Sequence, residues 1–408
     1  MDDLIAILLA IASPEVKLEG ITLTFGNTTL DYAHGNVMRL THALQETART
    51  IGFANKTLQQ RVMGETDMLD VPVALGATKP IGGRMFTASY FHGRDGMSGV
   101  SFIEGDPFPR AQESKLFRTQ PGEQPADELI LSVLRKHPPG TVRIAAVAPL
   151  TNLAQAYLKD PETFRRVGLI SVMGGALDVP GNTSPTAEFN FFADPWAAKV
   201  LLEDAVASGE PPLPIHLLPL DITSIHTVPY STLVREEGDP AFQASPLVRL
   251  VSSFLRKPRS VTNSFAPEGE PFDASKYDLF QAHDPLAVAH AIFCDPADAS
   301  SGWATLPREF VVETDGRHTR GFCVVDRRNH GKTYAGRNKA EVEEEQGPTH
   351  EHALEAEPAS KRTKTQDSGT PKGVGVPRIE MVTQTPGSAW LEDMILERMG
   401  LSPAVART

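Results

Sequence analysis

The sequence RIAAVAPLTNLAQAYLKDPETFRRVGLISVMGGALDVPGNTSPTAEFNFFADP, residues 143–195, contains the pattern that decides the fold. It opens with the short apolar run RIAAVA, which is typical of a buried strand and is interrupted at Pro149. An amphipathic segment then predicts a helix over 151–158, and GLISVMGG predicts a second buried strand ending in two glycines. This alternation predicts an α/β protein with a mostly parallel central sheet flanked by helices.

The loop after the second strand is rich in hydrogen-bonding side chains. Asn182, Glu188 and Asn190 lie close together in the sequence, among Gly and Pro residues. Ligands of parallel α/β sheets bind beyond the carboxyl ends of the strands, so this loop fits a site for a polyhydroxylated ligand. Composition alone predicts an ordinary turn equally well, because Asn, Gly and Pro dominate turns.

The composition of the 408 residues limits the class of protein. A content of 40% hydrophobic and 22% charged residues predicts a soluble globular protein, and the length allows one large α/β domain or two smaller ones. The net charge of −12 argues against nucleic acid as the main partner, because phosphate binding needs clustered Lys and Arg. No apolar run reaches the roughly 20 residues needed to cross a bilayer. The two cysteines, Cys294 and Cys323, form no CxxC pattern, so we expect no disulfide framework, no zinc site and a cytoplasmic location.

Three short motifs outside this stretch carry candidate functional residues. Asp2 and Asp3 begin an apolar helical pattern, and His283 and Asp284 stand immediately before another. Acidic residues at helix N-termini also stabilise the helix dipole or cap the helix, which is the structural explanation for both pairs. His92 lies in the glycine-rich segment YFHGRDGMSGV, where a histidine has no packing role, so we favour a functional one.

The motifs PLTN, MGG, GN, AEFN and DP, in this order, resemble the signature of the nucleoside hydrolases, the inosine-uridine-preferring nucleoside N-ribohydrolase family. The resemblance covers residues 2–328 and extends weakly into the C-terminal helix. It includes the loop at His92, the segment PLDIT and the HD pair at His283. It implies the nucleoside hydrolase fold and calcium-dependent hydrolysis of the N-glycosidic bond of uridine- or inosine-type ribonucleosides, giving ribose and free base.

The resemblance also implies a role for individual residues. Asp3 and Asp284 would bind Ca²⁺ through their carboxylates, and Val147 through its backbone carbonyl. His283, as proton donor to the departing base, and Asp3 would be the catalytic residues. The residues implied to contact the nucleoside are Asp2, Asn27, His92, Asn182, Glu188 and Asn190.

The family's acidic loop has the form DxDPGxDD, of which Asp2 and Asp3 match the last two aspartates. We therefore expect the gene to encode a DxDPGx segment upstream of Met1, and we expect weak calcium binding and little turnover without it. Two alternatives follow from other classes of protein. One is a catalytically impaired relative that binds nucleosides, and the other is an unrelated α/β sugar-binding protein without a metal.

The sequence predicts one domain with an insertion. Residues 1–336 would form the nucleoside hydrolase domain, and residues 373–408 would return to it as a strand and a helix. Residues 337–372 contain almost no large apolar side chains, so we expect a disordered insertion. The expected partners are a small-molecule nucleoside and further copies of the chain in a homo-oligomer, a dimer or tetramer, with neither nucleic acid nor membrane.

Overall fold

The computed structural model describes residues 1–66, 70–118, 124–205, 210–296, 298–327 and 378–400. The predicted disordered insertion at 337–372 lies outside the described residues. The proposed domain boundaries therefore stay predictions. Within the described ranges, no helix is long and apolar enough to span a membrane.

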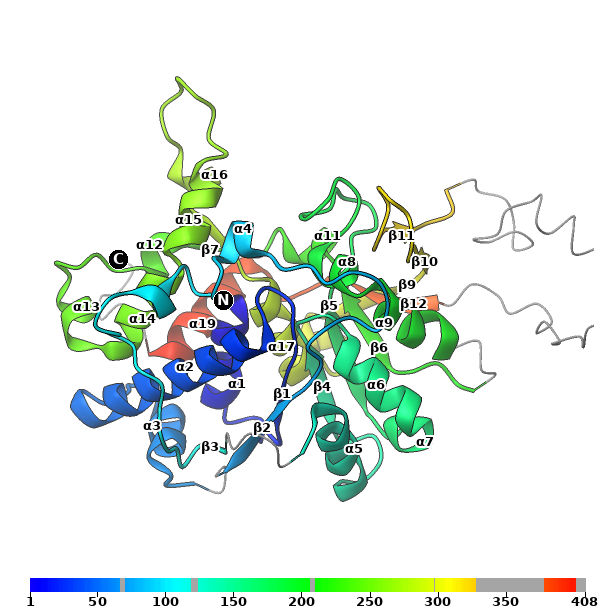
Figure 1. Ribbon diagram of the computed structural model, residues 1–408, viewed down its shortest axis with the longest axis horizontal. Helices are drawn as coiled ribbons and strands as arrows, with labels where there is room; N and C mark the ends of the chain where they lie inside the picture. The colour runs from blue at the N-terminus through cyan, green and yellow to red at the C-terminus, as the bar shows by residue number, and fades with distance from the viewer. Residues whose placement is uncertain (67–69, 119–123, 206–209, 297, 328–377, 401–408) are drawn as a thin grey trace, which may run out of the picture.

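A five-stranded sheet forms the centre of the molecule (Figure 1). Its strands, in spatial order, are β4 Arg143–Ala146, β5 Leu169–Met173, β6 Ile215–Leu218, β12 Arg378–Gln384 and β9 Ala304–Glu309. The first four are parallel, and β9 runs antiparallel to β12. All five residues of β5 are buried, as expected for a strand covered on both faces. The mostly parallel central sheet is confirmed.

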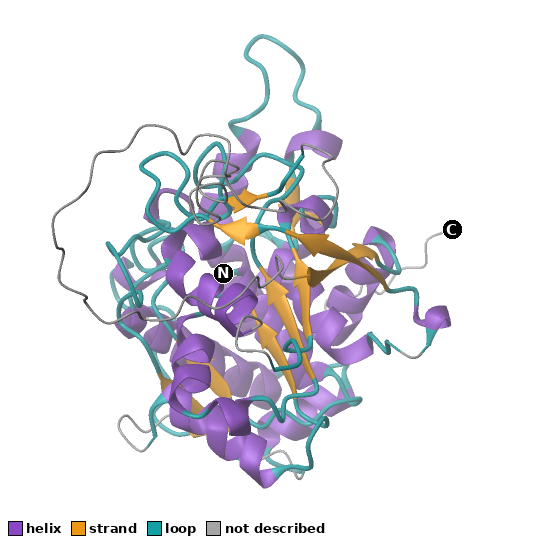
Figure 2. Ribbon diagram, turned by 90° about the vertical axis from the view of Figure 1, so that its right-hand side faces the viewer, coloured by secondary structure: helices purple, strands orange, loops and turns teal. Residues whose placement is uncertain are grey.

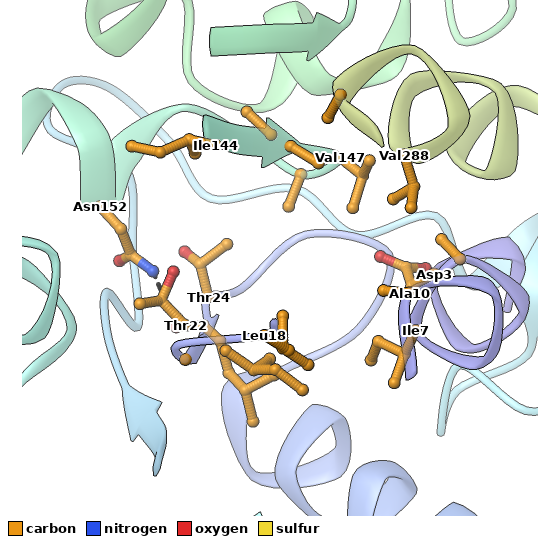
Figure 3. A pocket seen from close by; sticks show the side chains of 18 of the residues that line it. Asp3, Ile7, Ala10, Leu18, Thr22, Thr24, Ile144, Val147, Asn152 and Val288 are labelled. Atoms are coloured by element: carbon orange, nitrogen blue, oxygen red, sulfur yellow. Dashed lines mark hydrogen bonds between the residues drawn. The ribbon is translucent and has the colours of Figure 1, made fainter. Parts of the chain in front are cut away.

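Three smaller groups of strands complete the structure. A parallel sheet contains β1 Ile21–Leu23, β2 Val71–Leu75 and β3 Phe117–Arg118. Two antiparallel pairs are β7 Thr227–Pro229 with β8 Leu279–Gln281, and β10 Val311–Val312 with β11 Cys323–Val324. A cavity of about 900 Å³ lies between β1 and β4, so the two parallel sheets are separate (Figure 3).

Helices cover both sides of the central sheet (Figure 2). Those of the first half are α1 Asp2–Ala12, α2 Leu30–Thr50, α3 Lys56–Met63, α4 Ser89–His92, α5 Ala126–Lys136, α6 Thr151–Lys159 and α7 Pro161–Phe164, with a 3-10 turn at Val100–Phe102. Those of the second half are α8 Phe189–Ala193, α9 Pro195–Lys199, α11 Leu220–Thr223, α12 Tyr230–Leu233, α13 Pro240–Ala244, α14 Pro246–Phe254, α15 Arg256–Asn263, α16 Ala274–Tyr277, α17 His283–Phe293 and α19 Ser388–Met399, with a π-helical turn at Val200–Asp204 and a 3-10 turn at Ala299–Ser301.

The packing of α1 against α17 positions the polar residues discussed below. Helix α1 is almost entirely apolar after its first turn, and Leu4, Ile5 and Leu8 are buried completely or nearly so. Residues of α1, α2, α14, α17 and α19 share one hydrophobic core, and a second core lies between the central sheet and α5, α6 and α9. Because α17 also contacts β4 and β5, it links α1 to the sheet.

Candidate active site

The N-termini of α1 and α17 bring three carboxylates together. Oxygen atoms of Asp2, Asp3 and Asp284, which we call the acidic cluster, lie within 4.8 Å of one another. Asp284 is only 3% exposed. The amino group of Met1 lies 3.0 Å from Asp3 Oδ2 and 3.7 Å from Asp2 Oδ1, so its charge partly offsets the repulsion among the carboxylates. Segments that are far apart in the sequence thus form one concentration of negative charge.

The electrostatics of the acidic cluster favour a cation. Burial, and then the charges of Asp2 and Asp3, raise the pKa of Asp284 well above its ordinary value. A divalent cation among these oxygens would remove the repulsion, and Ca²⁺ prefers hard oxygen ligands of this kind. The donor set of the acidic cluster therefore fits such an ion.

Two residues that follow strands lie next to the acidic cluster. Asn27 follows β1, and its Nδ2 lies 3.4 Å from Asp3 Oδ2. Val147 follows β4 and lines the same cavity as Asp3 and Asn27. Figure 3 shows Asp3 and Val147 at one end of this cavity, with Asn152 at the other. Both positions lie at the carboxyl ends of parallel strands, where ligands of α/β proteins bind.

Glu188 holds its own loop in place with its carboxylate. It is 2% exposed and accepts hydrogen bonds from the backbone amides of Gly175, Asn190 and Phe191 at 2.9, 2.7 and 3.1 Å. Gly175 has φ +80°, and a Cβ there would lie 3.1 Å from Cys323 Sγ, so this turn needs glycine. Burial raises the pKa of Glu188 to about 7, and the charge of Asp2 adds to the effect. Glu188 thus lies within the field of the acidic cluster and also caps α8.

The two asparagines of the same loop lie in different surroundings. Asn190 is buried, lines the cavity that Asp3 lines, and donates to the carbonyl oxygen of Met173 at 3.1 Å. Asn182 is exposed, and its Oδ1 accepts a hydrogen bond from the amide of Phe189 at 2.9 Å. The Oδ1 atom of Asn182 therefore stabilises the loop in this structure.

Two histidines lie near the N-terminus of α1. His283 Nδ1 lies 2.8 Å from Thr223 Oγ1, and burial lowers the pKa of His283, while the charge of Asp2 opposes this. Burial, and then the charges of the Met1 amino group and His283, lower the pKa of His92 well below its usual value. His92 Nδ1 is buried and has no hydrogen-bond partner among the described residues. A bound ligand would supply the missing partner.

Comparison with known proteins places this geometry in a family. Residues 53–351 match the sequence model of the inosine-uridine preferring nucleoside hydrolases. The chain belongs to the nucleoside hydrolase family. It is 31% identical to an uncharacterized protein of Schizosaccharomyces pombe (strain 972) over 80% of this chain and 86% of the relative. It is also 31% identical to the pyrimidine-specific ribonucleoside hydrolase RihA of Enterobacter sp. (strain 638), over 80% of this chain and 84% of that protein.

Solved structures of nucleoside hydrolases share the fold. A plant nucleoside hydrolase matches with a TM-score of 0.63 and 20% identity, over 98% of this chain and 95% of that one. The purine-preferring ribonucleoside hydrolase from Gardnerella vaginalis matches with a TM-score of 0.62 and 21% identity over the same shares. The predicted nucleoside hydrolase fold is confirmed, and the chain is a hydrolase of the nucleosidase class.

Two buried aspartates hold the loops that carry candidate residues, although the sequence motifs gave them no role. Asp95 accepts hydrogen bonds from the amides of Met97, Gly99 and Ser101, which fixes the glycine-rich loop that carries His92. Asp194, in the DP motif, accepts from Thr151 Oγ1 at 2.6 Å and so joins this motif to PLTN. The sequence signal for these two residues was their position inside motifs, since Asp95 lies in the glycine-rich segment and Asp194 in DP.

Thr223, the hydroxyl partner of His283, was also missed. It ends α11, directly after the carboxyl end of β6, and is fully buried. Its place in the segment PLDIT, which follows a predicted strand, was the signal that pointed to the site.

Proposed function

We propose that this protein hydrolyses the N-glycosidic bond of uridine- or inosine-type ribonucleosides to ribose and free base, at the meeting point of α1 and α17. The observation that carries the proposal is the acidic cluster with His283 beside it. The pyrimidine specificity stated in the name of the RihA relative supports a substrate of the uridine type. A homo-oligomeric state stays a prediction.

Nucleoside hydrolases use a metal ion, and we propose Ca²⁺ for this protein. Asp3 and Asp284 would hold it through their carboxylates and Val147 through its backbone carbonyl. The support is the convergence of hard oxygen donors beside the cavity that Val147 lines. A bound divalent cation supplies Lewis acidity, which eases deprotonation of water.

The sugar would lie between the acidic cluster and the Glu188 loop. We assign the ribose hydroxyls to Asp2, Asn27, Asn182, Glu188 and Asn190, with His92 beside the nucleoside. The carboxylates favour the positive charge that develops on the sugar as the bond to the base breaks. The charge of Asp2 contributes to the raised pKa of Glu188, which supports the assignment of both residues to one ligand.

His283 would face the departing base. Its lowered pKa keeps the imidazole mainly neutral near pH 7. If the hydroxyl of Thr223 donates to Nδ1, the proton of the neutral ring lies on Nε2, where it can donate a hydrogen bond to the base. Full transfer of a proton to the base requires the imidazolium form of His283. Negative charge that builds on the base as the bond breaks would raise the pKa of His283, so that the ring takes up a proton from solvent and passes it to the base.

The test of the proposed function is an assay of reducing sugar released from uridine and inosine. The full chain is first treated with a chelator, and Ca²⁺ is then added back. We expect the turnover, however small, to disappear with the chelator and to return with Ca²⁺. Binding of uridine without turnover would favour the nucleoside-binding relative, and ribose binding that is indifferent to Ca²⁺ would favour the sugar-binding protein.

Glu188→Gln should weaken the binding of ribose by roughly ten- to a hundredfold, because a hydrogen bond to a charged group contributes about 1.5 to 3 kcal/mol. Gln keeps one acceptor for the amides of Gly175 and Phe191, whereas Ala would leave three buried amides unpaired. Calorimetric titration measures the affinity, and Glu309→Gln, on the exposed side of β9, is the matched control. Unchanged affinity would remove Glu188 from the ribose site.

The same Glu188→Gln variant tests the raised pKa of Glu188. The folded protein holds the Glu188 proton up to about pH 7, whereas the unfolded chain loses it near 4.5. The folded state therefore binds more protons in this window, and the free energy of unfolding should fall as pH rises through it. Glu188→Gln should flatten this slope in denaturant titrations between pH 4.5 and 7. An identical slope in both proteins would contradict the raised pKa.

A further inference from the structure

A row of polar side chains crosses the central sheet beneath α17, far from the N-terminus of that helix. Ser171 on β5 and Glu380 on β12 are both register partners of His216 on β6. Register partners on adjacent parallel strands point to the same face of a sheet. We call Ser171, His216 and Glu380 the polar row.

The C-terminal end of α17 brings a histidine and a cysteine to this row. His290 Nδ1 lies 2.7 Å from Ser171 Oγ, and His290 Nε2 lies 3.3 Å from His216 Nδ1. Ligand atoms of His216, His290 and Cys294 all lie within 4.8 Å of one another. His290 is fully buried and Cys294 is 4% exposed, whereas His216 is half-buried.

We propose that His216, His290 and Cys294, here called the His-Cys cluster, form a second cation site, which takes a thiophilic divalent ion of the Zn²⁺ class. Two imidazoles and a thiolate are donors that zinc prefers and calcium does not. The site differs from the acidic cluster in donor type. It also lies toward the other end of α17, because His290 is six residues beyond Asp284, which is about 9 Å at about 1.5 Å per residue.

The distances within the His-Cys cluster match such an ion. Two nitrogens bound tetrahedrally to zinc at about 2.0 to 2.1 Å lie about 3.3 to 3.4 Å apart. The two facing nitrogens of His216 and His290 are already 3.3 Å apart. The sulfur of Cys294 lies within 4.8 Å of the histidine ligand atoms. Tetrahedral coordination brings sulfur and nitrogen to about 3.5 to 3.6 Å, so binding would draw Cys294 in by up to about 1.3 Å.

The protonation states of the cluster also suit a metal. Burial lowers the pKa of His290 to about 3 and lowers that of His216, so both rings are neutral near pH 7 and offer lone pairs. When Ser171 Oγ accepts a hydrogen bond from His290 Nδ1, the lone pair of Nε2 is free for the ion. Burial raises the pKa of the Cys294 thiol, so binding the ion would release that proton to solvent.

Surrounding groups hold the donors and balance the charge. Trp303 packs edge-on against His290, with ring centroids 4.9 Å apart, and restrains the imidazole. Arg143 donates to the carbonyl of Cys294 at 2.8 Å, and its charge favours the thiolate. Glu380, the next residue of the polar row, carries a negative charge that acts on His216 and offsets the positive charge of Arg143. An ion here would fasten the C-terminal end of α17 to β6.

The test uses Co²⁺ as a spectroscopic substitute for Zn²⁺ on the chelator-treated full chain with Ca²⁺ in excess. We expect one equivalent of cobalt with the intense visible bands of tetrahedral coordination and a thiolate-to-cobalt charge-transfer band, both removed by Zn²⁺. Cys294→Ser should abolish the charge-transfer band, and His216→Ala should weaken binding at least tenfold. Cys323→Ser, at the other buried free cysteine, should change neither.

Asp284→Asn separates the two sites, because it alters the acidic cluster and should leave the cobalt spectrum unchanged. Cys294→Ser should leave calcium-dependent hydrolysis of uridine unchanged, because Cys294 lies at the far end of α17. Absence of a charge-transfer band in the unsubstituted protein would overturn the proposal without any variant, leaving a hydrogen-bonded chain from Ser171 to His216. A charge-transfer band that persists in Cys294→Ser would also overturn it.

Discussion

Asp284→Asn should reduce hydrolysis of uridine and inosine by at least about a hundredfold at a fixed Ca²⁺ concentration. Calcium affinity depends on the number of charged ligands, and this change removes one of the two proposed carboxylate ligands while keeping the shape of the side chain. Because less Ca²⁺ would be bound, fewer protein molecules would contain a cation that activates water. Steady-state assays over a range of Ca²⁺ concentrations measure the shift.

Asp284→Asn should lower activity but raise the thermal stability of the calcium-free protein. Without Ca²⁺ the variant should melt at a higher temperature, because the substitution removes a buried charge that faces two others. The unsubstituted protein should gain about 2.7 kcal/mol at a calcium concentration a hundred times the Kd, and the variant little. Asp239→Asn, an aspartate that caps α13, is the matched control. Equal stabilisation of variant and parent by Ca²⁺ would show that Asp284 is not a ligand.

His283→Ala should slow hydrolysis of uridine and inosine by about 10² to 10⁴, the usual contribution of general acid catalysis. A nitrophenyl riboside, whose leaving group needs no proton, should lose far less. Thr223→Val, which removes the hydroxyl 2.8 Å from His283 Nδ1, should give a smaller loss with the same substrate dependence. Values of kcat for both substrates provide the measurement.

His318→Ala, at an exposed histidine, is the control for this comparison and should behave as the unsubstituted protein. Equal losses on the nucleosides and on the activated riboside would contradict a role in protonating the base. That outcome would leave His283 as a residue that positions its neighbour Asp284.

The local sequence was sufficient to predict the strand, helix and strand of residues 143–195, and it indicated where a site is expected. Apolar runs and paired glycines are local signals, and the carboxyl-end rule then fixes which loops converge. The resemblance added Asp2, Asp3 and Asp284, which the structure brings within 4.8 Å. Periodicity alone does not relate residues so distant in sequence.

Features that depend on strand register or side-chain direction were not predictable. The polar row requires that β5, β6 and β12 be neighbours, and β12 follows β6 in the sheet only after a long stretch of chain. The cysteine spacing gave no sign of a zinc site, because the ligands of the His-Cys cluster come from a strand and from the end of a helix. Glu188 was assigned to ribose alone, since the sequence does not show that three amides point at its carboxylate.

The meeting of α1 with α17 has a consequence for the order of folding. Contacts between segments so far apart in sequence form late, because closing a long loop costs entropy before the contacts repay it. The acidic cluster therefore exists only after both helices have docked. A cation that binds it would leave the folding rate nearly unchanged and would slow unfolding, so its protective effect would appear as kinetic stability.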